Sequence, residues 1–322
     1  MKRFKNILYV ADPSGLVLQA FHHAVGLAER NNARLTVVMV LEHLPSYLMR
    51  PAPDKLRQVQ RNELQAALDR LCAWVSHRVK VEARILEGKP FLAVIREVIR
   101  NECDLVVKSV DDDDSTKALL FGSTDMHLLR KCPCPVWLIK STDPSSIRRV
   151  MACVHFNELD PSGRDTDEPL NRMILELAGS LARQEASELH IAHAWEAMGE
   201  NVLRGSRTDA DEEEVNSYVR EVGHRHRLWL ERLLRKSRQW IGPGAYDSLK
   251  RKTHVVKGPP DEVILKIVHV LRVDLIIMGT VARAGIPGIF IGNTAETILS
   301  KIDCSVLAVK PRDFVTPVTC ES

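Results

Sequence analysis

The chain has 322 residues, about twice the length of an ordinary domain, so two domains are expected. Its formal net charge of +3 is close to neutral and argues against an obligatory polyanionic partner, and its seven scattered cysteines exclude a secreted disulfide scaffold. No apolar run approaches the roughly 20 residues of a membrane span, and the run after Met1 is ended by Asp12 and Pro13 too soon for an export signal. We therefore expect a cytoplasmic protein with reduced thiols, no membrane span and no nucleic-acid partner.

The first half alternates β-branched apolar runs with segments of helical period, which is typical of βαβ units that build a parallel sheet. The runs are nearly all apolar, as strands covered on both faces must be. The expected strands are residues 7–11, 35–41, 79–86, 105–109 and 136–140. The expected helices begin near Leu16, Asp54, Pro90 and Ser123. Ser123 is better explained as a helix cap than as a nucleophile.

A polar linker at 141–146 separates this half from a second one of the same design. The second set of expected strands is 150–155, 189–195, 253–256, 275–278 and 306–309, with helices that begin near Glu168, Asp211, Pro260 and Asn293. Placing Gly88 on Gly258 and reading on without a gap as far as Lys140 on Lys310 aligns several identical residues: Pro90 with Pro260, Asp104 with Asp274, Gly122 with Gly292, Thr124 with Thr294 and Cys134 with Cys304. This register indicates a duplication.

The duplication predicts two domains, 1–143 and 147–322, the second with a C-terminal tail. The end strands of two parallel sheets need cover, and like halves can pair them across a pseudo-twofold axis. We expect such an intramolecular pseudo-dimer, with a further homodimer as the alternative.

The tripeptide Cys132-Pro133-Cys134 is a candidate for metal or redox chemistry. Its spacing is not the C-x-x-C of either chemistry, and no second Cys or His pair lies nearby in sequence. We therefore favour a packing role and expect no metal site.

The segment 224–240 is basic and has a helical period. Its expected buried stripe leaves the arginines on the solvent side, so a solvated face is favoured over a nucleic-acid or lipid-headgroup surface; the stripe is Val219, Val222, Trp229, Leu230, Leu233 and Trp240. His224 and His226 point in different directions and are expected to be exposed. His193, inside a strand run, is expected to be a core histidine and not a general base.

A glycine-rich loop follows the fourth strand of the second half. In an open parallel sheet, ligands bind beyond the carboxyl ends of the strands where the chain order reverses, so this loop is the candidate site. Gly279, Gly285 and Gly288 let the backbone approach a ligand, and Gly292 opens a helix whose amides favour an anion. Asn293 or Thr294 is the expected N-cap, and Arg283 is placed to pair with a terminal phosphate.

With this element order and loop, the chain resembles the universal stress protein family, and its tandem, UspE-like type in particular; residues 125–133 and 292–296 carry the resemblance most specifically. The family's loop is G-x-x-G, nine residues, then G followed by Ser or Thr. Gly279 and Gly292 match its first and last glycines, while Ala282 replaces the middle glycine and Asn293 the hydroxyl residue.

The resemblance implies a Rossmann-like α/β fold of two tandem domains, each a doubly wound five-stranded parallel sheet flanked by helices. It also implies a ligand site, and the expected residues are Gly279, Thr280, Ala282, Arg283, Gly285, Gly288, Gly292, Asn293, Thr294, His155 and Asp12. The family places an Asp after the first strand to contact the base. Asp12 keeps this residue in the first half, whereas His155 replaces it in the second.

Each half lacks one part of this site. Alanine at a position that requires a glycine costs roughly 1 kcal/mol, so Ala282 should weaken binding. In the first half, the acidic run 111–114 takes the place of the loop glycines and should repel a triphosphate, since a like-charge pair at about 4 Å costs about 4 kcal/mol. A solvated loop is favoured over a Mg²⁺ or Ca²⁺ site for this run.

The resemblance therefore implies a non-enzymatic, small-molecule-binding module of the bacterial stress response, with a weak or altered site for ATP or AMP with Mg²⁺ in the second half. One alternative is an apolar or lipid-like ligand beside Ile286, Pro287 and residues 289–291. A second alternative is a weak ATPase, which ranks lower because no general base or metal-binding acid accompanies the glycine loop.

Overall fold

The computed structural model describes residues 4–12, 18–42, 53–110, 121–140, 146–157, 166–205, 211–280 and 291–320. These residues form two compact units, Met1–Ser145 with Thr280–Ser322, and Ser146–Gly279. The end of the second sequence repeat is therefore packed with the first repeat. The domain limits 1–143 and 147–322 follow the duplication in the sequence and stay a prediction.

The first unit contains a five-stranded parallel sheet built by the first repeat. Its strands are β1 (Asn6–Val10), β2 (Arg34–Leu41), β3 (Val81–Glu87), β4 (Leu105–Val110) and β5 (Val136–Lys140). They lie in the order β3-β2-β1-β4-β5, all parallel, so the chain order reverses between β1 and β4. The parallel sheet confirms the prediction from the apolar runs, and the doubly wound order is the one that the family resemblance implies.

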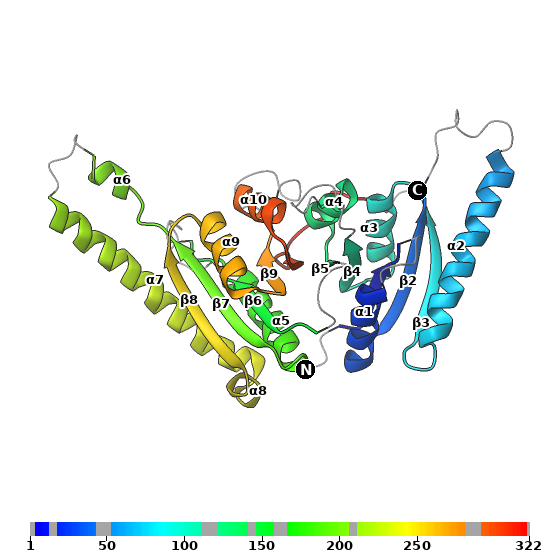
Figure 1. Cartoon of the computed structure of the whole chain (residues 1–322), viewed down its shortest axis with the longest axis horizontal. Coiled ribbons are helices and arrows are strands. Elements are labelled where there is room, and N and C mark those ends of the chain that lie inside the picture. Colours follow the sequence, from blue (N-terminus) through cyan, green and yellow to red (C-terminus); the bar gives the residue numbers. More distant parts are fainter. Residues whose placement is uncertain are drawn as a thin grey trace. The chain divides into compact units, whose positions relative to one another are not determined.

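Helices cover this sheet on both faces. They are α1 (Leu18–Asn31), α2 (Pro53–Val75), α3 (Pro90–Arg100) and α4 (Ser123–Lys131). Figure 1 shows β2 and β3 between α2 on one side and α3 on the other. The expected start of the first helix, near Leu16, lies outside the described residues.

The first unit also contains α10 (Asn293–Lys301) and β10 (Ser305–Val309), the last elements of the second repeat. Strand β10 pairs antiparallel with β5, with Leu307 opposite Trp137. Both strands are fully buried. The outer edge of β5 is thus covered by the corresponding strand of the other repeat.

The second unit contains four parallel strands, β6 (Arg149–Cys153), β7 (Glu188–Trp195), β8 (Lys250–Lys257) and β9 (Leu275–Gly279). Their order is β9-β6-β7-β8, which repeats the order β4-β1-β2-β3 of the first repeat. The third strand is longer than the expected 253–256, because the basic residues at its start still continue the ladder with β7.

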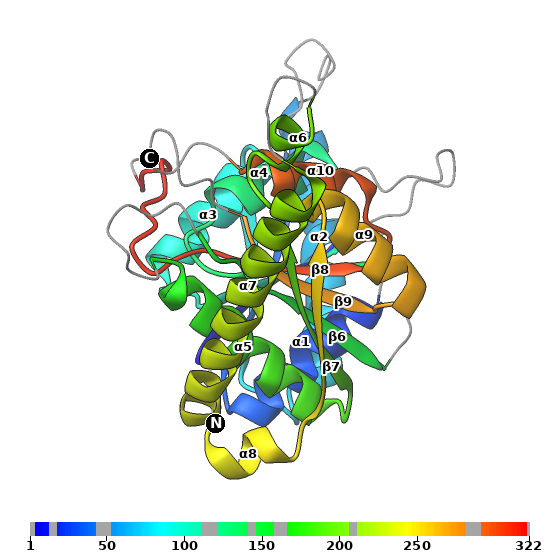
Figure 2. The ribbon, with the colours of Figure 1, turned by 90° about the vertical axis from the view of Figure 1, so that its left-hand side faces the viewer.

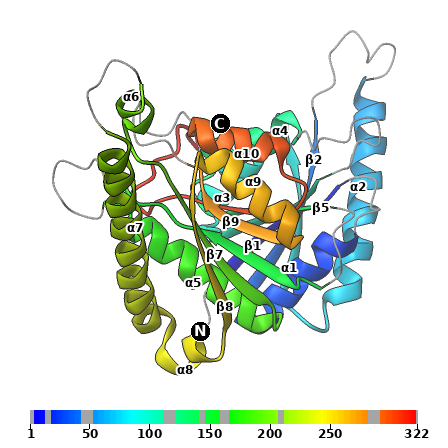
Figure 3. The ribbon, with the colours of Figure 1, turned by 60° about the vertical axis from the view of Figure 1, so that its left-hand side comes forward.

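Five helices are described in this unit: α5 (Glu168–Gln184), α6 (Glu200–Leu203), α7 (Glu212–Ile241), α8 (Pro243–Asp247) and α9 (Pro260–Leu271). Figure 2 shows α5 and α7 side by side, and Figure 3 shows them on one face of the strands with α9 on the other. The short helices α6 and α8 were not expected from the sequence. No described helix is both long and apolar enough to cross a membrane.

Candidate functional site

Three of the residues predicted to bind a ligand lie at the ends of strands next to which the strand order reverses, between β1 and β4 and between β6 and β9. Asp12 follows β1, His155 follows β6, and Gly279 is the last residue of β9. Four of the predicted residues, Ala282, Arg283, Gly285 and Gly288, lie outside the described residues, as does the apolar segment 286–290.

Gly279 and Thr280 are both engaged in packing at the end of β9. A Cβ atom on Gly279 would lie 2.7 Å from Cδ2 of Leu170, so the glycine lets α5 approach the strand. Thr280 is 1% exposed, and its hydroxyl donates to the carbonyl of Leu129 at 3.3 Å. Its backbone N–H donates to the carbonyl of Val309 at 3.2 Å. Both the side chain and the backbone N–H of Thr280 are therefore hydrogen-bonded within the first unit.

The start of α10 closes the loop that begins at Thr280. The N–H of Gly292 donates to the carbonyl of Thr280 at 3.2 Å, which ties the residue before α10 to Thr280. Gly292 is the N-cap of α10 and provides no side-chain hydrogen bond, so the expected capping by Asn293 or Thr294 is wrong. Both of these side chains are exposed. The first-turn amides of α10 are therefore not satisfied by a capping side chain, which suits an anion.

The corresponding helix of the first repeat, α4, has a buried carboxylate side chain in its first turn. Its N-cap is Gly122, so the expected capping by Ser123 is also wrong. Asp125, in the first turn, has a side chain only 5% exposed and lies 3.0 Å from the ammonium of Lys108 on β4. The same ammonium donates to the carbonyl of Ser109 at 2.8 Å. An internal ion pair thus occupies this place in the fold.

The second repeat has no such pair at the aligned positions, because Met278 replaces Lys108 and Ala295 replaces Asp125. The sequence predicts loss of the first site through the acidic run 111–114, which lies outside the described residues. The ion pair of Lys108 with Asp125 was not predicted, although a position-by-position comparison of the two repeats would have indicated it.

The two first-strand residues differ in their surroundings. Asp12 is half-buried, and together with burial its charge raises the pKa of Tyr9. His155 exposes its side chain, while its backbone N–H and carbonyl are both bonded to the amide of Asn171, at 3.0 and 2.7 Å. Asn171 of α5 therefore fixes the end of β6.

A buried histidine pair lies near this strand end and was not predicted. Nε2 of His193 on β7 lies 2.9 Å from Nδ1 of His226 on α7, and Phe156 and Trp229 contact the His226 and His193 rings. Burial lowers the pKa of His193, a backbone hydrogen bond to Val154 opposes this shift and the neighbouring His226 adds to it, and the resulting pKa is about 4.

The prediction that His193 is a core residue is confirmed, and the prediction that His226 is exposed is wrong. The physical reason is helical spacing: His226 is four residues after Val222 and three before Trp229, so it lies on the apolar stripe of α7. Four residues of the expected stripe are buried, Val222, Trp229, Leu230 and Leu233, whereas Val219 and Trp240 are only half-buried. The arginines at 225, 227, 232, 235 and 238 are exposed as expected.

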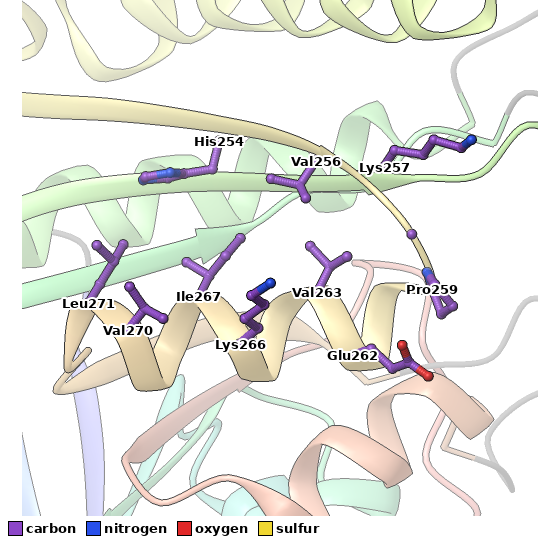
Figure 4. Close-up of a pocket in the computed structure, with 11 residues that line it drawn as sticks. His254, Val256, Lys257, Pro259, Glu262, Val263, Lys266, Ile267, Val270 and Leu271 are labelled. Atoms are coloured by element: carbon purple, nitrogen blue, oxygen red, sulfur yellow. The ribbon is translucent and has the colours of Figure 1, made fainter. Parts of the chain in front are cut away.

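A cavity of about 400 Å³ lies in the second unit between β8 and α9. Figure 4 shows Val263, Ile267 and Val270 pointing from the helix toward the strand that carries His254 and Val256, with Lys266 among them. Glu262 points away from the strand in this view. The lining is mostly apolar.

The aligned positions in the first repeat are filled by a polar network. There Arg84 replaces His254, and its guanidinium bonds Glu97 at 2.8 Å and Asn101 at 3.1 Å. Glu97 and Asn101 align with Ile267 and Leu271 of the cavity lining. At these positions the second repeat therefore has an apolar cavity where the first repeat has a hydrogen-bonded ion pair.

Two segments of the chain, residues 3–140 and 165–310, match the model of the universal stress protein family. The chain belongs to this family. The two matches explain the duplicated strand order and confirm the tandem arrangement of universal stress protein domains. Among the described residues, no group of three or more His, Cys, Asp or Glu side chains is placed to hold a metal ion.

Curated relatives match along nearly the whole universal stress protein chain. Universal stress protein E of Escherichia coli K12 is 29% identical over 99% of this chain and 98% of its own length. A homolog of universal stress protein E from Haemophilus influenzae is 27% identical over 96% of this chain and 98% of its own.

Solved structures agree in fold. A Pseudomonas aeruginosa PAO1 protein of unknown function superposes with a TM-score of 0.70 at 23% identity, over 97% of this chain and 95% of that one. A universal stress protein from Archaeoglobus fulgidus gives a TM-score of 0.60 at 16% identity, over 95% and 98% of the two chains.

Proposed function

We propose that this universal stress protein is a cytoplasmic, small-molecule-binding regulatory protein of the stress response whose second repeat retains a weak site for ATP or AMP, with Mg²⁺ accompanying the phosphates. Proteins of this family are generally not enzymes. The site consists of the loop 279–292 and the first turn of α10, with His155 in place of the base-contacting acid.

The observation that carries the proposal is the contrast between α4 and α10. Asp125 and Lys108 supply an internal anion and its counter-ion at the start of α4, whereas Ala295 and Met278 leave α10 without the aligned pair. The acidic residue in the first turn of α10, Glu296, is exposed and paired with Arg130 at 2.6 Å. A helix N-terminus without a capping side chain attracts phosphate through its free amides and dipole. The second repeat is therefore the one that can accept an anionic ligand.

Equilibrium dialysis with ATP and with AMP, each at millimolar concentration with Mg²⁺, tests this site. A Gly292→Asp variant should lose binding by at least about tenfold, because its carboxylate would lie beside the phosphates. The matched control is Gly122→Asp at the aligned position of the first repeat, which should leave binding unchanged. Equal losses in both variants, or no binding by the unaltered protein, would refute the site.

A second candidate ligand is apolar or lipid-like, and the cavity between β8 and α9 favours it. The test replaces His254 by Arg, Ile267 by Glu and Leu271 by Asn, which installs the network that fills this space in the first repeat. Native mass spectrometry of the purified protein should show a co-purifying compound that the triple variant lacks. A spectrum of the unaltered protein without any bound mass would count against this candidate.

Weak ATP hydrolysis is the lower-ranked alternative. It predicts phosphate release above a buffer blank that is lost in an Arg283→Ala variant. Release that is absent, or that is unchanged by this substitution, leaves the protein as a binding module.

A further inference from the structure

Two thiols meet at the end of α4 in the first unit. Cys132 is the C-cap of α4 and Cys134 precedes β5 by two positions. Their sulfur atoms lie 3.6 Å apart. Cys132 is fully buried and Cys134 is 7% exposed, so the pair faces the interior and not the solvent.

The third member of this cluster comes from the end of the second repeat. Lys310 directly follows β10, is 3% exposed, and its ammonium makes no hydrogen bond within the part of the chain that the structure describes. The ring of Phe314 in the C-terminal tail lies 5.2 Å from it. A buried ammonium without a hydrogen-bond acceptor is costly, so an anion beside it is favoured.

The pKa shifts of Lys310, Cys132 and Cys134 favour an anionic sulfur beside the ammonium. Burial lowers the pKa of Lys310 to about 8, against the two sulfur atoms, which raise it. Burial alone would raise the pKa of Cys132, but a hydrogen bond with Cys134 and the charge of Lys310 bring it below its usual value. The hydrogen bond to Cys132 and burial raise the pKa of Cys134. Of the two thiols, Cys132 is therefore the one favoured as a thiolate.

Packing accounts for one of the two thiols but not for both. Cys134 aligns with Cys304, which is buried at the same place in the second repeat. Cys132 aligns with Ile302, also buried, so the fold accepts an ordinary aliphatic residue there. The second sulfur is therefore specific to the first repeat, whereas the lysine has a buried counterpart, because Lys310 aligns with Lys140.

We propose that Cys132 and Cys134 are a dithiol that reacts with small hydroperoxides, with Lys310 holding the reactive thiolate and supplying the proton that the reaction consumes.

The Cys132 thiolate attacks one oxygen of the peroxide, forming an S–OH bond and breaking the O–O bond, and the departing alkoxide or hydroxide takes a proton from the Lys310 ammonium. The neutral Lys310 amine then takes the proton of the Cys134 thiol. The new thiolate attacks the Cys132 sulfur and displaces hydroxide, which is protonated by Lys310 to water. Two thiols are oxidised to a disulfide, and the peroxide is reduced to an alcohol or water, and a second water.

The location of the two sulfurs makes the test direct, because trypsin releases residues 132–140 as one peptide that contains both. The full-length protein is treated with hydrogen peroxide, then unfolded in N-ethylmaleimide and digested. Before oxidation this peptide should carry two maleimide groups. After oxidation the peptide should carry no maleimide group, and its mass should be that of the unmodified dithiol peptide less two hydrogens. Dithiothreitol should reverse the change. A peptide that still carries two maleimide groups would overturn the proposal, as would a cross-link from Cys132 to Cys103.

Three variants separate the roles of the residues. Lys310→Met should slow oxidation by about tenfold or more, since a pKa change of one unit alters the thiolate fraction tenfold. Cys134→Ser should leave a sulfenic acid at Cys132 that dimedone traps. The matched control is Cys304→Ser, which should oxidise at the unaltered rate.

An unchanged rate in Lys310→Met would remove the lysine from the mechanism. Circular dichroism establishes that each variant is folded, and the measurement on the unaltered protein decides the dithiol whether or not a variant folds. Cys320, which is exposed, is the internal reference thiol. Oxidation of Cys132 and Cys134 no faster than modification of Cys320 would contradict a site built for peroxide.

Discussion

The buried histidines of the second unit illustrate how burial sets the properties of single residues. His193 and His226 share one hydrogen bond inside a setting of aromatic rings, where an imidazolium would be poorly solvated. His190 is also buried, and burial lowers the pKa of both His190 and its neighbour His254. All three pKa shifts act in the same direction.

Acidification should therefore destabilise the protein. Below pH 6.5 His193 becomes protonated in the unfolded chain, whereas in the folded chain it stays neutral down to about pH 4. The free energy of unfolding therefore falls as the pH decreases through this window. The contribution of His193 is about 3 kcal/mol at most. Urea unfolding at a series of pH values measures it. A His193→Gln variant should show a flatter profile, and an equal slope in both proteins would contradict this origin.

The elements of the second unit pack closely because small residues permit it. Helix α7 lies against β7 through Gly223, where a Cβ atom would meet the ring of Trp195 at 2.7 and 2.8 Å. Trp195 forms a small core with Ala197 and Val222. The indole ring is rigid and buried, so it has little room to move.

Replacing Gly223 by Ala should accordingly lower the free energy of unfolding by about 1 to 2 kcal/mol, after the gain in helix propensity is subtracted from the cost of overpacking. Gly244→Ala is the matched control, since nothing lies within 4 Å of its added Cβ and its φ is not positive. That control should be neutral or slightly stabilising in thermal unfolding. A stabilised Gly223→Ala variant would show that α7 shifts freely on the strand.

The start of α7 is secured by a capping box. The Asp211 carboxylate accepts from the N–H of Glu214 at 2.9 Å, and the Glu214 side chain accepts from the N–H of Asp211 at 3.3 Å. An Asp211→Ala variant should cost about 1 kcal/mol of stability in chemical unfolding, whereas Asp211→Ser should recover most of it. Equal losses in the two variants would mean that charge and not capping is responsible.

At the scale of the whole molecule, the first unit includes a strand of the second repeat, β10. The antiparallel pairing of β10 with β5 covers an edge that the first repeat cannot cover by itself. The thiol cluster has the same origin, because Lys310 reaches Cys132 and Cys134 only through this pairing.

A fragment of residues 1–143 should consequently self-associate. It retains the five parallel strands but exposes β5, a wholly buried strand in the intact protein, as a free edge. Size-exclusion chromatography with light scattering should find dimers or larger species that the full chain does not form at the same concentration. A stable monomeric fragment would show that the repeat protects its own edge.

Local patterns in the sequence were sufficient for the strands, the main helices and the parallel order of each repeat, because apolar runs and helical periods depend on neighbouring residues alone. The family resemblance, confirmed by the two family matches, rests on the same local patterns. The helix caps were wrong at α4 and α10, since the choice among Gly122, Ser123, Gly292 and Asn293 depends on backbone angles that composition does not determine.

Tertiary structure alone decided the contents of the candidate sites. The pairing of Lys108 with Asp125, of His193 with His226 and of Lys310 with the thiols joins residues from separate elements. Their burial and electrostatic fields do not exist until those elements pack. The sequence by itself therefore determined the family, the duplication and the framework, and the packed chain determined which charges and thiols face one another.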